Sequence, residues 1–253
     1  MSTWTTRTTV GQLVNERPAR ARIFERLGID YCCGGRLPLA DACAKRGLDP
    51  DTVADQIRAD DQAADAPDDG PDWAAASASD LADHIEATHH ARLREQLPRL
   101  TAMAVKVAQV HGGRHPSLVQ LRNVFERFAL ELNSHMAKEE RILFPWIRLL
   151  ERNADGAPAG VSNPVAQMIH EHDDAGDDLA QMRALTNGFT PPPDACGTWR
   201  VLLDELRQLE ADMHQHVHKE NNILFPKAIE LDRARAADAA SSCSCGIRCR
   251  DEG

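Results

Sequence analysis

The chain has 253 residues, a net charge of −10 and a pI near 5.5. Its few β-branched and aromatic residues favour an all-helical protein, and its acidic balance excludes the basic face of a nucleic-acid binder. No apolar run approaches the roughly 18 residues of a membrane span, and no apolar segment marks a secretory signal. We therefore expect a cytoplasmic protein that binds neither nucleic acid nor membrane. In that compartment its seven cysteines are expected to be reduced, metal-binding or redox-active.

Residues 1–60 are predicted to form a small helical domain that carries a Cys-Cys motif. Short helices are predicted over residues 10–16, 19–27, 39–46 and 51–59. Cys32 and Cys33 lie between the second and third of these, and the two glycines that follow them mark a tight turn. Residues 61–78 are rich in aspartate, alanine, glycine and proline, which is typical of a linker.

Residues 79–235 change to the pattern of long amphipathic helices. We predict four of them, over about 79–110, 117–151, 164–186 and 195–235. Short links between long helices favour an up-down-up-down four-helix bundle. Residues 236–253 are expected to be a flexible tail, in which Cys243, Cys245 and Cys249 either bind a soft metal or are incidental.

One short stretch occurs twice in this region. It runs from His135 to Pro145 and again from His216 to Pro226, with a glutamate four residues after each histidine, at Glu139 and Glu220. Side chains four residues apart share one face of a helix, about 5–6 Å apart at Cβ. The two histidines and the two glutamates are each separated by 81 residues (216 − 135 and 220 − 139). The repeat therefore predicts a duplicated metal-binding hairpin.

A duplicated hairpin requires one further histidine on each preceding helix. His90 and His172 are 82 residues apart, and apolar residues follow both at the same offsets. His89 lies nearer the middle of the local apolar arc than His90 does, so the choice between these two stays open. His214 and His218 lie on other faces of their helix than His216 and are expected at the surface or beside the ligands.

Four histidines and two glutamates in one bundle core fit a pair of metal ions. Buried carboxylates are costly unless they are paired or bind metal, and one carboxylate can bridge metals roughly 3.5–4 Å apart. Imidazole and carboxylate ligands favour iron or manganese over a thiolate-type zinc site, without separating the two. Glu131 and Glu171, which lie near ligands in sequence, either orient those ligands and relay protons or are ordinary solvated acids.

With these motifs the chain resembles the repair-of-iron-centres family of di-iron iron–sulfur cluster repair proteins, over about residues 8–230. The resemblance is carried by Asp30-Tyr-Cys-Cys-Gly-Gly35, His90-Ala-Arg-Leu-Arg-Glu-Gln-Leu-Pro98, Lys138-Glu-Glu-Arg-Ile-Leu-Phe-Pro145, Glu171-His-Asp-Asp-Ala-Gly176, Pro191-Pro-Pro-Asp-Ala-Cys196 and Glu220-Asn-Asn-Ile-Leu-Phe-Pro226. In that family a short Cys-Cys domain precedes a hemerythrin-like bundle with a non-haem di-iron centre. This chain has His89 where relatives are expected to carry a tyrosine.

The resemblance implies which residues bind metal and what the cofactor is. The implied ligands are His90, His135, Glu139, His172, His216 and Glu220. The implied cofactor is two iron ions with the two glutamates and a solvent-derived group as bridges. No separate catalytic residue and no organic cofactor is assigned.

The resemblance also implies a role in stress response. The chain would repair iron–sulfur clusters damaged by nitrosative or oxidative stress by supplying iron. Its partners would be iron–sulfur client proteins, nitric oxide or oxygen as small ligands, and a second copy in a homodimer. A nitric oxide or peroxide reductase at the same centre is the alternative, so enzymatic activity stays open. The Cys-Cys domain argues against a third hypothesis, a simple oxygen carrier or sensor.

The cysteines of the N-terminal domain have two interpretations. Adjacent Cα atoms lie about 3.8 Å apart, so Cys32 and Cys33 cannot form a relaxed disulfide with each other. The motif suggests transient thiol chemistry, metal transfer or pairing with another subunit, but the residues alone also fit two small buried side chains beside a turn. The family resemblance favours instead a thiol or metal-transfer site at this pair. Cys43 and Cys196 are expected to be structural.

Overall fold

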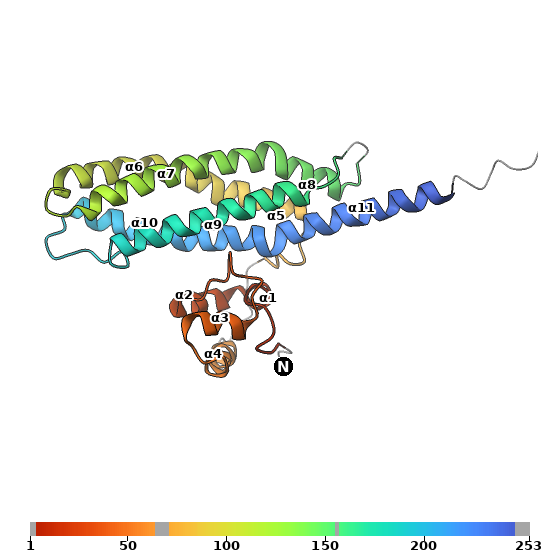
Figure 1. The fold of residues 1–253 in the computed structure, drawn as a ribbon, viewed down its shortest axis with the longest axis horizontal. Coiled ribbons are helices and arrows are strands. Elements are labelled where there is room, and N and C mark those ends of the chain that lie inside the picture. Colours follow the sequence, from red (N-terminus) through yellow and green to blue (C-terminus); the bar gives the residue numbers. More distant parts are fainter. Residues whose placement is uncertain (1–3, 64–70, 155–156, 246–253) are drawn as a thin grey trace, which may run out of the picture.

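The computed structural model describes residues 4–63, 71–154 and 157–245. Figure 1 shows a small N-terminal unit beside a long helical bundle. Over the described ranges the chain is helical, with no strand beyond one isolated bridge between Thr9 and Pro38. The all-α prediction is confirmed. No helix in these ranges is both long enough and apolar enough to cross a membrane.

The N-terminal unit closely follows the four helices predicted for it. It contains α1 (Val10–Glu16), η1 (Pro18–Arg20), α2 (Ala21–Leu27), α3 (Leu39–Arg46) and α4 (Pro50–Ala63). Local chemistry decides where these helices begin and end: Thr9 and Gln12 form a capping box before α1, and Gly28 ends α2 with a φ of 66°. Buried side chains such as Phe24 and Ile57 give the unit its own apolar core.

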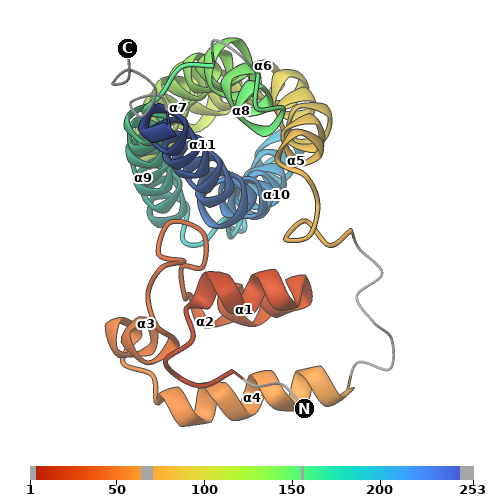
Figure 2. The same cartoon turned by 90° about the vertical axis from the view of Figure 1, so that its right-hand side faces the viewer.

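The bundle has four arms, three of which are interrupted by a π-helical turn. The first arm is α5 (Ala78–Ile85), η2 (Glu86–His90) and α6 (Ala91–His111), and the second is α7 (Ser117–Lys138), η3 (Glu139–Leu143) and α8 (Phe144–Glu151). The third is α9 (Ser162–Leu185), and the fourth is α10 (Gly197–Lys219), η4 (Glu220–Leu224) and α11 (Phe225–Cys245). Figure 2 shows the arms end on, grouped around a common axis.

The bundle holds two apolar clusters along this axis rather than one. One cluster includes Leu100 and Phe128, and the other includes Ile85, Phe144 and Phe225. The π turns lie where the arms pass from one cluster to the other. This boundary is where the polar residues of the interior are concentrated.

The π turns were not predicted, because a period-3.6 pattern only indicates continuous helix. Each closes with a backbone hydrogen bond to the carbonyl five residues back: Ala91 to Glu86, Phe144 to Glu139 and Phe225 to Glu220. In the second and fourth arms a proline follows immediately, at Pro145 and Pro226. Proline has no N–H to donate, so the regular ladder is already broken at that point.

The C-terminal helix is longer than predicted. Its predicted end lies at residue 235 and the tail over 236–253 is predicted to be flexible, whereas α11 continues to Cys245. The reason is the alanine-rich run after Asp232, since alanine is the best helix former and extending a helix costs less than starting one. The metal-binding alternative for Cys243, Cys245 and Cys249 concerns side chains outside the described ones.

The N-terminal unit packs against the fourth arm of the bundle, as Figures 1 and 2 show. Asn222 of η4 donates hydrogen bonds to the backbone oxygens of Tyr31 (3.2 Å) and Cys32 (3.0 Å). A glycine makes room for it, because a Cβ atom on Gly35 would lie 2.2 Å from Asn222 Oδ1. Gln215 also donates to the Tyr31 hydroxyl. These contacts bring the Cys-Cys turn next to the middle of the bundle.

Candidate metal centre

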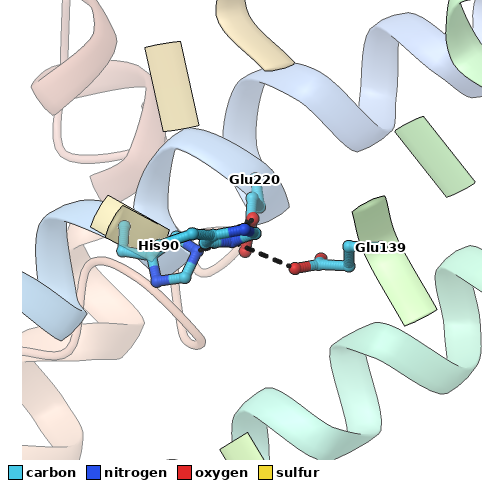
Figure 3. Close-up of side chains that lie close together, drawn as sticks. His90, Glu139 and Glu220 are labelled. Carbon is cyan, nitrogen blue, oxygen red and sulfur yellow. Dashed lines mark hydrogen bonds and ion pairs between the residues drawn. The ribbon is translucent and has the colours of Figure 1, made fainter. Parts of the chain in front are cut away.

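All six predicted ligands lie together in the middle of the bundle. They are His90 at the end of η2, His135 on α7, Glu139 at the start of η3, His172 on α9, His216 on α10 and Glu220 at the start of η4. All are buried, and both glutamates are 0 % exposed. Figure 3 shows His90, Glu139 and Glu220 pointing toward one another from separate helices.

The ligand atoms form two groups that share the two glutamates. His90 and His216 belong to one group, with their Nε2 atoms 3.2 Å apart; His135 and His172 belong to the other, with theirs 3.0 Å apart. We call these the His90/His216 position and the His135/His172 position. In each group all the ligand atoms lie within 4.8 Å of one another.

The glutamates reach both positions. Glu220 Oε1 lies 3.0 Å from His216 Nε2, while its Oε2 lies 3.1 Å from His172 Nε2. Glu139 Oε2 lies 3.2 Å from His135 Nε2 and 3.4 Å from His90 Nε2. Each carboxylate is therefore oriented to bridge two metals, one at each position.

This geometry fits a metal pair. With metal–ligand bonds of about 2.0–2.1 Å and angles of about 90–110°, two donors to one metal lie roughly 2.9–3.4 Å apart. The six distances given above fall in this range, and His90 Nε2 lies 4.0 Å from Glu220 Oε1. Both oxygens of Glu139 and Oε2 of Glu220 are buried without a hydrogen-bond donor among the described residues. Buried carboxylate oxygens without donors are costly, so a cation at each position would supply the missing partners.

The electrostatics of the cluster also favour bound cations. Burial opposes ionisation of Glu220, but His216 and His172 hold its pKa well below the usual range. Burial also works against protonation of His135, yet Glu139 and Glu171 raise the pKa of that ring to about 10. The carboxylates therefore remain anionic and demand positive charge beside them, which protons or metal ions can provide.

Three of the ligand histidines have a partner at Nδ1, the ring nitrogen that faces away from the metal positions. His90 Nδ1 lies 2.8 Å from Glu140, His135 Nδ1 lies 2.9 Å from Glu171, and His172 Nδ1 lies 2.9 Å from Asn221. An Nδ1–H that donates to such an oxygen leaves the Nε2 lone pair free for a metal and fixes the ring orientation.

Sequence reasoning anticipated only one of these partners. Glu171 lies where it can orient the His135 ring, which was one of the two alternatives for it, and it also pairs with Lys138. Glu131 is exposed on the outside of α7, away from the cluster. Glu140 and Asn221 were missed, although a signal existed: each directly follows the glutamate of one repeat.

The structure places His90, and not His89, among the ligand atoms. His89 is buried beside them, with Nε2 2.8 Å from Lys219 Nζ and Nδ1 3.3 Å from Asp212. His218 was expected at the surface or beside the ligands, and the surface alternative is wrong, because His218 is buried with Nδ1 3.4 Å from the backbone oxygen of Tyr31. Docking of the N-terminal unit, which the helix pattern could not indicate, covers that face of α10.

The cysteine pair forms a separate small group with Asp30. Cys32 Sγ lies 3.2 Å from Asp30 Oδ1, and Cys33 Sγ donates to the backbone oxygen of His172 at 3.7 Å. The neighbouring Cys33 thiol and burial raise the pKa of Cys32, so it is a neutral thiol at pH 7. The Cys-Cys turn thus touches the helix turn that carries a predicted ligand.

The other described cysteines behave differently from each other. Cys43 is fully buried in the core of the N-terminal unit, which agrees with a structural role. Cys196 was expected to be structural as well, but it is exposed at the start of α10. Loop cysteines carry no periodic pattern, so burial at this position could not be judged from sequence.

Comparison with known proteins gives matches over both parts of the chain. Residues 81–228 match the family described as the hemerythrin HHE cation binding domain, and residues 6–61 match a domain of unknown function, DUF542. Proteins named iron-sulfur cluster repair protein YtfE are similar along most of their length. Those from Pectobacterium atrosepticum and Edwardsiella ictaluri are 40% identical, and that from Escherichia coli O81 is 37% identical. Each match covers 87% of this chain and 96% of the relative.

Proposed function

We propose a repair function from one premise: this chain belongs to the family of iron–sulfur cluster repair proteins that carry a hemerythrin cation-binding domain. In this proposal the chain binds two iron ions and supplies iron to clusters damaged by nitrosative or oxidative stress. The observation that carries it is the pair of buried glutamates, each reaching both histidine pairs. That arrangement suits two adjacent cations held by the same side chains.

The donor set supports iron as the metal. Imidazole nitrogens and carboxylate oxygens suit iron, and no thiol belongs to either ligand group in the described chain. Two histidines and two glutamates would give each iron four protein donors, so a solvent-derived bridge and small ligands would fill the remaining coordination positions. When bound, the iron pair would supply redox chemistry and open coordination positions for nitric oxide or oxygen.

The chain's own residues would hold and release the iron. Glu140, Glu171 and Asn221 orient three of the histidines, which keeps the ligand atoms converged without rearrangement. The Cys-Cys turn contacts the arms of both positions: Cys33 donates to the backbone oxygen of His172, and Asn222, on the arm that carries His216, donates to the backbone oxygen of Cys32. These contacts support a transfer role for the turn. Thiols suit this role because, once deprotonated, they are strong ligands for the iron that leaves the bundle.

The proposed function also includes the protein's partners, its compartment and its oligomeric state. Its clients would be iron–sulfur proteins in the cytoplasm, and the functional unit would be a homodimer. Sedimentation of the purified chain at several concentrations measures the dimer directly. A mass that stays at one chain throughout would contradict it.

The test of function is iron transfer to a damaged client. The chain, loaded with ⁵⁷Fe, is mixed under anaerobic conditions with an iron–sulfur dehydratase whose cluster has been damaged by nitric oxide. We expect enzyme activity to return, ⁵⁷Fe to appear in the client cluster and iron to disappear from the chain in proportion. Unlabelled clusters, or activity that returns equally with the metal-free chain, would contradict iron donation.

A further inference from the structure

The two metal positions are related by the internal repeat of the chain, so they can be compared residue by residue. An offset of 81 relates the second arm to the fourth, and an offset of 82 relates the first to the third. The corresponding pairs are His135 and His216, Lys138 and Lys219, Glu139 and Glu220, Glu140 and Asn221, His90 and His172, and His89 and Glu171. Differences between partners in these pairs show where the two positions are unequal.

The Nδ1 partners reveal one such difference. In the His135/His172 position both rings have a partner, Glu171 for His135 and Asn221 for His172. In the His90/His216 position Glu140 is the partner of His90. His216 Nδ1 is buried without a hydrogen-bond partner among the described residues. Each position thus has one histidine with a carboxylate partner, His135 in one and His90 in the other. The positions differ at the second histidine, because His172 has a partner and His216 has none among the described residues.

The cause is the residue at position 89. Its counterpart in the other half, Glu171, is the carboxylate that supports His135. His89 instead lies flat against the His216 ring, with centroids 5.2 Å apart and an angle of 5° between the planes. A stacked imidazole offers its face to its neighbour, whereas hydrogen-bond acceptors lie in the ring plane. His89 therefore cannot replace the missing acceptor.

The ion pairs around His89 also differ from those around Glu171. Lys138 pairs with the Glu171 carboxylate, so its charge is neutralised directly beside His135. Its counterpart Lys219 is directed at His89 Nε2, 2.8 Å away, and not at a carboxylate that supports a ligand. The acid on this side, Asp212, lies 3.3 Å from His89 Nδ1 and 3.6 Å from Arg92, and it is no hydrogen-bond partner of His216 Nδ1.

We infer that the two positions hold their metals unequally: the His90/His216 position releases its iron first, and the His135/His172 position retains it. The inference rests on the proposed two-iron function and names which iron is the exchangeable one. Loss of one outer hydrogen-bond partner typically lowers metal affinity about 10–100-fold. We expect the two irons to differ by at least about tenfold in affinity on this ground.

The test is an equilibrium competition between the ferrous protein and a ferrous-ion chelator, with retained iron measured at each chelator concentration. The wild-type chain is expected to lose its irons in two steps, separated at least about tenfold in chelator concentration. His89→Glu installs the counterpart of Glu171 and is expected to move the first step toward the second. His89→Leu is the matched control, since it removes the ring but adds no acceptor and leaves the first step in place.

A second variant assigns the steps if His89→Glu fails to fold or to reach His216. Asn221→Leu removes the Nδ1 partner of His172 and is expected to move only the second step, toward the first. A single step from a fully loaded wild-type chain would overturn the inequality, and so would a shift of the first step in Asn221→Leu. Loading of fewer than two irons per wild-type chain would instead count against the two-iron centre itself.

Discussion

At the scale of single residues, the centre depends on two buried glutamates whose close contacts are with the ligand histidines. Both oxygens of Glu139 have no hydrogen-bond donor in the described chain, and neither has Oε2 of Glu220. Buried anions of this kind are retained only where something positive meets them.

The proposed two-iron function predicts that replacing either glutamate removes iron. Glu139→Leu and Glu220→Leu each delete oxygens that reach both positions, so we expect at most one iron per chain and loss of the visible absorption of the oxidised protein. Metal analysis and absorption spectra measure both effects. Glu131→Leu is the matched control, because Glu131 is an exposed acid on the same arm as Glu139. Two irons per chain in both bridging variants would contradict the assignment.

Replacing the paired cysteines should separate iron transfer from iron binding. Cys32→Ser and Cys33→Ser lie outside both ligand groups, so we expect two irons per chain but transfer to a damaged client slowed at least severalfold. Cys196→Ser is the control, since that thiol is exposed at the start of α10. Transfer at the wild-type rate in both paired variants would exclude a transfer role for the turn.

At the scale of helices, three of the predicted ligands lie in the π turns, where the helical register of an arm shifts by one residue. Glu139 and Glu220 begin such turns and His90 ends one. A π turn inserts one residue into the helical ladder, which rotates the helix on one side of it relative to the other. The second arm and the fourth arm can therefore bury an apolar stripe on both sides of a polar cluster. In η4 the same turn also presents Asn222 to the N-terminal unit.

This contact between η4 and the N-terminal unit can be broken at a glycine. An added Cβ at Gly35 would lie 2.2 Å from Asn222 Oδ1, so Gly35→Ala must displace the amide or the unit. Overpacking of this kind costs about 1–3 kcal/mol. We expect a larger radius of gyration by small-angle scattering and slower iron transfer. Gly113→Ala, where a Cβ meets nothing within 4 Å, should change neither. An unchanged radius for Gly35→Ala would show that the interface tolerates the methyl group.

At the scale of the whole molecule, the centre lies between two apolar clusters and ties all four arms together. A cluster of buried charges weakens a bundle at this point unless metal neutralises it. Metal ions that bind only the folded chain stabilise it by mass action, by about 2.7 kcal/mol at a hundredfold excess over the dissociation constant.

Removal of iron should therefore lower the unfolding temperature. For a chain of this size 1 kcal/mol corresponds to roughly 2–4 °C, so the metal-free protein should unfold several degrees earlier than the loaded one. Differential scanning calorimetry of both forms measures this shift. The shift should be smaller in Glu139→Leu, which serves as the control for binding elsewhere. Equal unfolding temperatures of the loaded and metal-free wild type would contradict a metal that holds the arms together.

The sequence by itself determined the all-helical bundle and the residues that meet inside it. Helical periodicity is local, and two copies of His-x-x-x-Glu at matched spacing specify which faces of two helices look inward. The spacing of the repeat also predicted His172 as a ligand and made His90 a candidate ligand. Resemblance to a known family then supplied the metal and the repair role, which helix geometry alone does not contain.

Only the tertiary structure decided what surrounds those ligands. Glu140 meets His90 across 50 residues of sequence, and Asn221 meets His172 across 49. The choice of His90 over His89, the burial of His218 and the docking of Asn222 against the Cys-Cys turn are equally long-range. Such contacts depend on how far each helix is rotated and how the N-terminal unit packs. A one-residue π turn changes that rotation, and a helical pattern of period 3.6 does not show where such a turn lies.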